Sequence, residues 1–589
     1  MPNRWLNKDR FILLGVSLPF VFMGAGSISF LEPDEGMYGS IAREMVEGGD
    51  WITPHYNGVR YLEKPPLYFW LTAFTTALFG PSEWAVRIWS GLPALGAALL
   101  TWRMGNLIYG GYAGLLSGLV MISNVGVFRY VRVAATDSLL VFSLTLAMYG
   151  FLKATQHQAS NAQREWLGPV LFYVGSALGV LSKGLIGAVF PFLIVGLYIL
   201  FSGERLTPRQ MNLRWGLALF FILTLPWHML AAWKNPGFFE FYIVDNQFLR
   251  FLNSRAFIDD DIPLTTFAFL MLSFVWFFPW SFFLGPALCR GFARPRSELP
   301  HTERPRLVVG LWALTVIGFF SLSTSKLEHY FLPAIPPSSL MIGGLWKEAM
   351  SPGRTNVGLK WCLGAAALGC LLFGVGLLLF SELLTPGTLL AGLAQLNVSY
   401  RILQAEGGPF LFPVAPFIQL LKILGAVLVV GVPLSFILFY FRMIKASFAT
   451  ILCVAGVVVM LIFKLLLVIE PYHSVKSLSL IVKAQANQED AIIHEGSLEY
   501  SGGLPFYTGR RIYLLNGRQG DLDFGSRYAE SQYLFLDNEE FVRLWQSHRK
   551  VFFVTRFGEK ESVLHKLPIK GTRFLGRYGS RSLYSNHGP

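Results

Sequence analysis

Charge is scarce in this chain, which has 589 residues. Only 14% of them are Asp, Glu, Lys or Arg, whereas 53% are hydrophobic. This composition excludes an ordinary soluble globular protein, so most of the chain must lie in lipid. Apolar runs of about 20 residues, the length that crosses a bilayer as a helix, recur up to about residue 470.

Cysteine is also rare, and its placement excludes a disulfide framework. All four cysteines, Cys289, Cys362, Cys370 and Cys453, fall in or beside apolar runs rather than in the polar C-terminal region. None of them resembles a metal site. The polar C-terminal region has no nucleotide-binding fingerprint and no nucleophile elbow, and no repeat of 20–50 residues is evident in the chain. Its net charge of +13 is scattered over separate loops, so we expect no nucleic-acid partner.

Hydropathy predicts about 13 transmembrane helices. They lie near residues 11–30, 84–102, 111–127, 134–152, 168–182, 185–202, 215–232, 263–288, 307–324, 330–346, 360–381, 415–441 and 448–469. The first run follows basic residues, as a signal peptide does, but it ends in Phe30-Leu31-Glu32 rather than at a small-residue cleavage site. We therefore expect a retained first helix.

The basic residues predict the orientation of these helices. Positive charge favours the cytoplasmic loops of a membrane protein. With the N-terminus in the cytoplasm, the following basic residues all fall on that side: Arg4, Lys8, Arg10, Arg205, Arg209, Arg214, Arg290, Arg294, Arg296, Arg304, Arg306, Lys347, Arg354, Lys360, Arg442 and Lys445. The loops 31–83, 233–262 and 382–414 then face outward, together with the C-terminal tail.

The composition changes at about residue 471, after which no segment is long enough to span a bilayer. Residues 491–494, 511–515, 533–536 and 551–555 are typical of short strands. A helix is predicted at 539–546, with Asp537-Asn538 at its N-cap. The fold class we expect is an all-α polytopic membrane protein with a soluble α/β domain at 471–589. Packing or substrate gating is the simplest role for that domain.

The first outer loop carries two pairs of charged residues. Asp34-Glu35 could simply begin a helix, since acidic residues are favourable in a first turn. It could also supply a general base at the mouth of a membrane cavity. Glu63-Lys64 precedes Pro65-Pro66, which holds the backbone extended and restricts where Lys64 points. That lysine either anchors the loop at the interface or binds a phosphate.

Three further outward segments carry ionisable residues. Arg129 and Arg132 lie on the outer side, against the charge bias, which suggests an anionic ligand there. Asp137 begins the next span, where a carboxylate must either form an ion pair or be in contact with water. An ion pair with Arg132 or Arg129 would give Asp137 a purely structural role. Lys183 lies in another short outward turn. The turn at 325–333 adds the group Lys326, Glu328, His329 and Tyr330.

These residues carry a resemblance to a known family. The run from Pro33 to Leu71 is similar to the first outer loop of membrane glycosyltransferases that use polyprenyl-phosphate sugars. This family contains the aminoarabinose lipid A transferases and the protein O-mannosyltransferases, within the C-type glycosyltransferase superfamily. The resemblance extends to residues 132–137, 182–184 and 325–333. The expected span count and C-terminal domain are also like those of the lipid A transferases.

The resemblance implies an inverting transferase on the periplasmic face of a bacterial inner membrane. Its donor would be a sugar on undecaprenyl phosphate, and its acceptor a lipid A-type glycolipid or a protein. Residues 1–470 would form the transmembrane catalytic domain, among membrane lipids, and 471–589 a periplasmic domain. Asp34 and Glu35 would be catalytic, and the substrate would be bound by Glu63, Lys64, Arg132, Asp137, Lys183, Lys326, His329 and Tyr330. The resemblance implies no cofactor and no convincing metal site. It leaves open whether the enzyme needs a divalent metal ion.

One departure bears on the acceptor and the sugar. Lipid A transferases commonly carry an arginine three residues after the first aspartate, and this chain has Met37 there. An alternative from another class is a transporter or flippase for a lipid or polyprenyl-linked substrate, and a third is a structural membrane subunit. Transporters tend to keep ionisable residues near mid-membrane and to show internal repeats, which this chain lacks.

Overall fold

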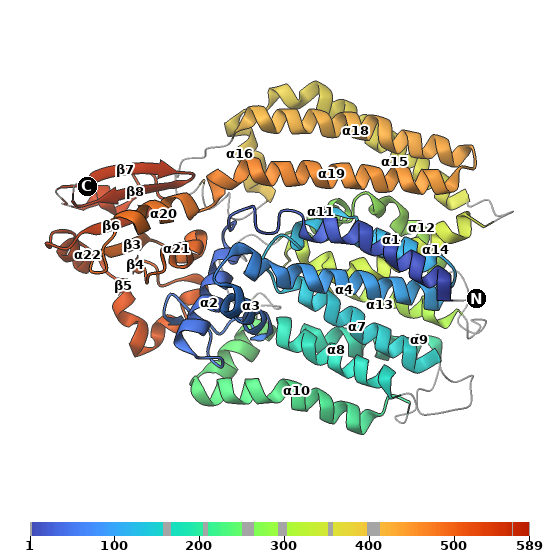
Figure 1. Ribbon diagram of the computed structural model, residues 1–589, viewed down its shortest axis with the longest axis horizontal. Helices are drawn as coiled ribbons and strands as arrows, with labels where there is room; N and C mark the ends of the chain where they lie inside the picture. Colours follow the sequence, from blue (N-terminus) through green and yellow to red (C-terminus); the bar gives the residue numbers. More distant parts are fainter. Residues whose placement is uncertain are drawn as a thin grey trace.

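The structure is a computed structural model. It describes residues 3–156, 166–203, 210–249, 264–291, 303–324, 326–351, 357–396, 404, 413–567, 569 and 571–587. Long helices lie side by side in a bundle, and a mixed α/β part caps one end of it (Figure 1). The N-terminus lies at the opposite end of the helices, so the chain is strongly polarised along its long axis.

A helix occupies each of the 13 predicted spans. These helices are α1 (Asn3–Phe22), α4 (Glu83–Tyr109), α5 (Ala113–Ile122) with α6 (Val125–Tyr130), α7 (Asp137–Gln156), α8 (Leu167–Lys183), α9 (Ile186–Ser202), α10 (Leu213–Lys234), α11 (Thr266–Trp276) with η4 (Trp280–Phe283) and α12 (Leu284–Gly291), α13 (Arg304–Leu322), α14 (Ile335–Ala349), α15 (Val357–Phe380), α18 (Val414–Tyr440) and α19 (Ile444–His473).

Fewer than 13 of the helices are both long enough and apolar enough to cross a bilayer by these two criteria alone. Among the described residues six do so, or seven if α11 and the segment Trp280–Arg290, bent by 109° from it, form one span. Several others, such as α8 and α9, are apolar but have 17 residues each. Their rise of about 1.5 Å per residue brings them close to the bilayer core thickness without exceeding it.

The first outer loop folds into its own small layer. It contains α2 (Asp34–Gly48), the hairpin strands β1 (His55–Tyr56) and β2 (Val59–Arg60), and α3 (Leu67–Phe79). Helix α2 carries Asp34 and Glu35 in its first turn and ends at Gly49, whose φ of 68° allows the left-handed C-cap. The start of a helix at Asp34, one of the two expectations, is therefore confirmed.

The C-terminal part is built on a six-stranded sheet in the order β5-β4-β3-β6-β8-β7. Its strands are β3 (Ala491–Glu495), β4 (Tyr513–Leu515), β5 (Phe535–Leu536), β6 (Val551–Thr555), β7 (Arg573–Tyr578) and β8 (Arg581–Ser585), with helices α20 (Lys476–Gln485), α21 (Gly503–Thr508), α22 (Asn538–Trp545) and α23 (Val563–Lys566). Strands β5, β4, β3 and β6 are parallel, and β8 is antiparallel to both of its neighbours, β6 and β7. Four of the strands lie in predicted segments, and β7 and β8 were not predicted.

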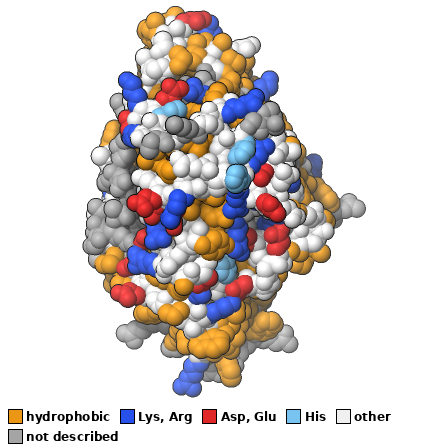
Figure 2. All heavy atoms as spheres, turned by 90° about the vertical axis from the view of Figure 1, so that its left-hand side faces the viewer, with side chains coloured by type: hydrophobic (Ala, Val, Ile, Leu, Met, Phe, Trp, Pro, Cys, Tyr) orange, Lys and Arg blue, Asp and Glu red, His pale blue; other side chains and the backbone are white. Residues whose placement is uncertain are grey.

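The capping prediction for α22 is correct in detail. The Asp537 side chain accepts from the Glu540 backbone N–H, and the Glu540 side chain accepts from the Asp537 N–H, which together form a capping box. Figure 2, which views this end of the molecule, shows side chains of both charges spread over it, as suits a surface in water.

The other two predicted outer loops are only partly described. The loop 233–262 contains the π-helix η2 (Glu240–Leu249), and its residues from 250 onward lie outside the described part. The loop 382–414 contains the end of η7 (Ser381–Leu383) and α16 (Pro386–Leu396), followed by residues that lie mostly outside it.

Candidate active site

A cavity of about 960 Å³ lies where the helix bundle meets the first loop and the C-terminal part. Eight of the ten residues predicted for catalysis or substrate binding line it: Asp34, Glu63, Lys64, Asp137, Lys183, Lys326, His329 and Tyr330. They come from four separate stretches of the chain. Glu35 and Arg132 are the two that the structure does not bring to the cavity.

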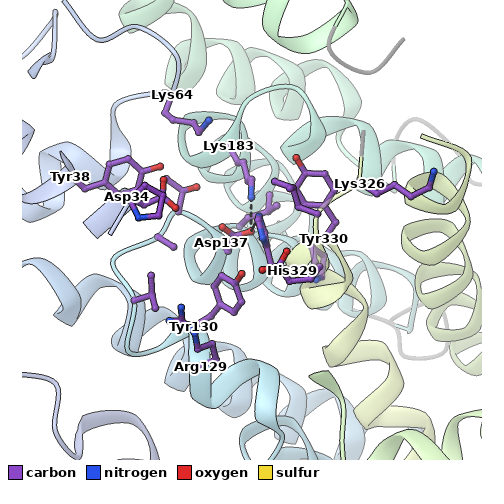
Figure 3. A pocket seen from close by; sticks show the side chains of 18 of the residues that line it. Asp34, Tyr38, Lys64, Arg129, Tyr130, Asp137, Lys183, Lys326, His329 and Tyr330 are labelled. Carbon is purple, nitrogen blue, oxygen red and sulfur yellow. Dashed lines mark hydrogen bonds and ion pairs between the residues drawn. The ribbon is translucent and has the colours of Figure 1, made fainter. Parts of the chain in front are cut away.

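Asp34 faces the cavity from the first turn of α2 (Figure 3). The backbone N–H groups at a helix N-terminus favour a negatively charged side chain there. Tyr38, which sequence reasoning missed, follows one turn later and lies beside Asp34 at the same wall. The signal was present, because residues four apart share one face of a helix.

Glu35 points away from the cavity into a fully buried ion pair. Its two oxygens lie 2.7 and 2.8 Å from the Arg87 guanidinium of α4. They also accept from the backbone N–H groups of Leu31 and Ala134, each at 2.8 Å. Both oxygens are therefore occupied by donors, and Glu35, expected to be catalytic, instead ties the start of α2 to α4 and to the segment before α7.

Asp137, Lys183 and His329 form the charged centre of the cavity (Figure 3). The Asp137 carboxylate begins α7, and its Oδ1 lies 2.5 Å from the Lys183 Nζ at the end of α8. His329, in the 3₁₀ helix η6 (Glu328–Ala334), approaches the same oxygen to 3.8 Å. Asp137 is thus paired with Lys183. The expected structural pairing with Arg129 or Arg132 is wrong.

Aromatic rings surround this centre. The Lys183 Nζ lies 5.4 Å from the centroid of the Tyr330 ring, a cation–π distance. The His329 ring is packed between Tyr130 and Tyr330, with centroid separations of 5.3 and 5.0 Å. These contacts hold the lysine and the imidazole at the cavity wall. Lys326 also lines the cavity, but its amino group extends away from Asp137 (Figure 3).

Arg132 lies outside the cavity. Its guanidinium stacks on the Phe128 ring at 3.5 Å from the centroid and donates to the Phe128 carbonyl at 3.1 Å. Arg129, one turn earlier, lines the cavity instead. One of its guanidinium nitrogens, Nη1, is buried without a hydrogen-bond partner in the described part of the chain. Of the two arginines that suggested an anionic ligand, the structure thus places Arg129 at the cavity and not Arg132, to which substrate binding had been assigned.

The C-terminal part also contributes to the wall of the cavity, through Glu499, Tyr500 and Asp521. No local sequence signal marks these residues, because only the tertiary fold carries them to the cavity. Lys64 from the first loop is paired with its neighbour Glu63 and extends over the cavity (Figure 3). Within the residues described, no three His, Cys, Asp or Glu side chains are grouped so that they could hold a metal ion.

Known proteins resemble this chain in both sequence and fold. Residues 27–242 match the model of the dolichyl-phosphate-mannose-protein mannosyltransferase family. An undecaprenyl phosphate-alpha-4-amino-4-deoxy-L-arabinose arabinosyl transferase from Serratia proteamaculans is 27% identical over 328 residues, which are 55% of this chain and 57% of that protein. A protein of the same description from Pseudomonas fluorescens is 28% identical over 380 residues, 62% of this chain and 64% of its own. The matches thus span less than two thirds of these curated relatives.

The fold is shared over nearly the whole chain with solved structures of ArnT. The crystal structure of ArnT from Cupriavidus metallidurans, bound to undecaprenyl phosphate, superposes with a TM-score of 0.79 at 22% identity. The superposition covers 99% of each chain. The predicted fold class, many membrane helices with a C-terminal α/β domain, is confirmed by this likeness. The chain is thus similar to the dolichyl-phosphate-mannose-protein mannosyltransferase family over residues 27–242, and its fold is that of the ArnT structure over nearly its whole length.

Proposed function

We propose that this protein is an inverting glycosyltransferase that moves an aminoarabinose-type sugar from undecaprenyl phosphate to lipid A. The observation that carries the proposal is one cavity with a carboxylate, Asp34, on one wall and the cations Lys64, Arg129 and Lys183 on others. The names of its curated relatives, which match at 27–29% identity, support the same donor and sugar. The buried Met37 at the place of the commoner arginine lines the same cavity.

The reaction would be a single displacement. Asp34 accepts the proton of the acceptor hydroxyl, and the acceptor oxygen forms a bond to the anomeric carbon. The bond from that carbon to the phosphate oxygen breaks, and undecaprenyl phosphate leaves with the bonding electrons. Lys64, Arg129 and Lys183 would stabilise the charge that develops on the leaving phosphate, which is the step where fixed cations contribute most.

The remaining polar groups of the cavity suit a sugar. Asn246, from η2, is largely buried at the cavity wall, and both polar atoms of its amide lack hydrogen-bond partners in the described part of the chain. Buried amides without partners are costly in a folded protein. Sugar hydroxyl groups, which both donate and accept, are suitable partners for them. The apolar residues that line the rest of the cavity are suited to contact with a lipid chain.

We place the protein in a bacterial inner membrane with a cytoplasmic N-terminus. In this proposal residues 1–470 form the catalytic transmembrane domain with outer loops 31–83, 233–262 and 382–414, and residues 471–589 form a periplasmic domain. The positions of the basic loop residues support this orientation. The cavity lies at the end of the bundle that bears the C-terminal part, so donor and acceptor would both meet it from the periplasmic side.

The test is transfer by an Asp34→Asn variant in cells that lack a working copy of this chain. We expect wild type to add a pentosamine mass to lipid A in mass spectra and Asp34→Asn to abolish it while the protein stays folded in the membrane. Asp50→Asn, in the same loop but outside the cavity and paired with Lys234, is the matched control and should retain transfer. Full activity of Asp34→Asn would remove its catalytic role. A sugar on protein in place of lipid A would overturn the acceptor.

A further inference from the structure

One apolar helix is broken where it borders the cavity. Helix α11 and the segment Trp280–Arg290 meet at an angle of 109°. The break is held against α6 and the residue before it: the Val125 N–H donates to the Phe278 carbonyl at 3.2 Å, and the Trp280 indole N–H donates to the Ser123 hydroxyl at 3.0 Å. Broken helices occur in membrane proteins where the irregular backbone is buried or lines a cavity. The end of α11 is therefore fixed at the cavity wall.

The last residue of α11, Trp276, carries an indole N–H that has no acceptor. Trp276 lines the cavity, and its Nε1 is buried without a hydrogen-bond partner in the described part of the chain. Its ring packs edge-on against Tyr130 of α6, with ring centroids 5.8 Å apart. An indole nitrogen is a donor only, and a buried donor without an acceptor is costly. This N–H is therefore suited to a ligand that supplies an oxygen.

A second donor without an acceptor lies on the neighbouring element. Arg129, next to Tyr130, lines the cavity, and its Nη1 is the guanidinium nitrogen noted above that lacks a partner (Figure 3). Because Tyr130 contacts Trp276, both donors belong to one wall, formed by α6 and the end of α11. An indole and a guanidinium can donate to different oxygens of one phosphate. The neutral indole N–H donates whatever the charge on Asp137 and Glu328, the carboxylates that act on Tyr130.

The wall changes from apolar to polar at Trp276. Leu272 and Val275, which precede it in α11, line the cavity, and α9 and α13 add Val189 and Phe319. A lipid phosphate needs an apolar surface for its chain and N–H donors where the chain ends. A free phosphate would use only the polar part of this wall. The order of the residues therefore favours a phosphate at the head of a lipid chain.

We propose that Trp276 and Arg129 form one subsite for a lipid phosphate, in which the indole N–H and the guanidinium donate to separate phosphate oxygens. The break after α11 then sets how far the phosphate enters the cavity. This inference rests on the proposed function, in which Arg129 faces the phosphate of the donor, and adds Trp276 to it. The phosphate belongs to the polyprenyl donor or to a phosphorylated acceptor lipid, and the arms of the experiment distinguish these sources.

The experiment measures binding of two lipid pairs to the purified full chain in detergent: undecaprenyl phosphate against undecaprenol, and lipid A against dephosphorylated lipid A. Trp276→Phe keeps an aromatic ring and removes the N–H. We expect it to raise Kd for undecaprenyl phosphate at least about fivefold, the loss of one hydrogen bond to a charged group, and to leave Kd for undecaprenol unchanged. Arg129→Gln should act in the same direction. Trp233→Phe, on a tryptophan that is 83% exposed, is the matched control and should change neither.

A loss confined to undecaprenyl phosphate assigns the subsite to the donor, and a loss confined to phosphorylated lipid A assigns it to the acceptor. No loss with either phosphorylated lipid, or an equal loss with the dephosphorylated forms, would overturn the subsite. If Trp276→Phe does not fold, Arg129→Gln provides the same readouts. The assay requires no transfer, so a wild type that prefers the phosphorylated lipid but transfers no sugar would refute the proposed function and leave the subsite standing.

Discussion

Two neighbouring carboxylates, Asp34 and Glu35, show how one residue step separates chemistry from structure. Successive residues of a helix point about 100° apart, so α2 turns Asp34 to the cavity and Glu35 into the protein. The Arg87 partner of Glu35 also donates to the carbonyls of Ala25 and Ser29, at 3.2 and 2.9 Å. A buried charge of this kind is stable only when its hydrogen bonds are satisfied, as they are here.

At the residue scale, Lys183 should matter far more than Lys326. Lys183→Met removes the amino group next to Asp137, so KM for the donor should rise about tenfold or more, the loss of a hydrogen bond to a charged group. Lys326→Met should raise it no more than about fivefold, because its amino group extends away from that centre. Donor titrations of both variants test this. Similar effects of the two substitutions would show that the cavity binds phosphate by overall charge alone.

Glu32 should make stability depend on pH. Burial raises its pKa to about 8, against the opposing attraction of Arg581. Between the unfolded pKa of 4.5 and about 8 the folded state keeps a proton that the unfolded state has lost, so stability falls as pH rises. The slope is at most about 1.4 kcal/mol per pH unit. Thermal unfolding in detergent from pH 5 to 8 should show this slope in wild type and a flatter one in Glu32→Gln.

Glu530→Gln provides the control for that experiment. Burial acts to raise the pKa of Glu530, but its backbone hydrogen bond and Arg60 outweigh this and lower the pKa. Its contribution is present above 4.5 and lost only as pH falls below that value, so it is constant from pH 5 to 8. The pH slope of Glu530→Gln should therefore match that of wild type. An unchanged slope in Glu32→Gln would refute the assignment.

At the scale of elements, the contact that matters most is between α2 and α21. Gly503 N–H donates to the Glu32 Oε1 at 3.0 Å, and the Ser40 hydroxyl donates to the Gly502 carbonyl at 3.3 Å. Arg43 reaches the Phe506 carbonyl at 3.0 Å. The helix that carries Asp34 is thus held by the C-terminal part along about two turns, from Gly36 to Arg43.

The close approach of these helices predicts a large effect of one methyl group. A Cβ at Gly36 would lie 2.1 Å from the Gly503 backbone nitrogen, so Gly36→Ala must push the two elements apart. We expect a loss of about 2 kcal/mol or more in stability and a loss of transfer. Gly48→Ala, in the same helix with nothing within 4 Å, should be neutral or stabilising by about 0.5 kcal/mol. Thermal unfolding of both variants measures the two changes in stability, and equal stabilities of Gly36→Ala and Gly48→Ala would contradict the packing argument.

At the scale of the whole molecule, the C-terminal part is a fixed wall of the cavity. The first loop and the C-terminal part share one hydrophobic core, in which Tyr38 and Phe30 pack with Leu504 and Phe506. The ion pair between Lys476 and Glu83, at 2.7 Å, adds a polar connection to α4. Because the C-terminal part and the bundle are packed together, the shape of the cavity is built into the folded state.

The proposed orientation gives a prediction at this scale. An alkaline phosphatase fused after residue 589 should be active, because that enzyme folds only in the periplasm, and a fusion in the 203–214 loop should be inactive. The second fusion is the matched control, since its loop carries Arg205, Arg209 and Arg214. The reverse pattern of activities would place the cavity on the cytoplasmic side and contradict the proposed reaction.

The sequence by itself determined the bundle helices and four of the six strands of the C-terminal sheet. Apolar runs located every bundle helix because hydropathy acts over about 20 consecutive residues, and the capping box at Asp537 is likewise local. The first-loop motif located Asp34, Glu63 and Lys64 at the cavity. The tertiary structure alone decided that Asp137 pairs with Lys183, that Arg129 rather than Arg132 lines the cavity, and that Glu499 and Asp521 come to it. Asp137 and Lys183 lie 46 positions apart in the sequence, and no local pattern encodes which distant side chains a packed fold brings together.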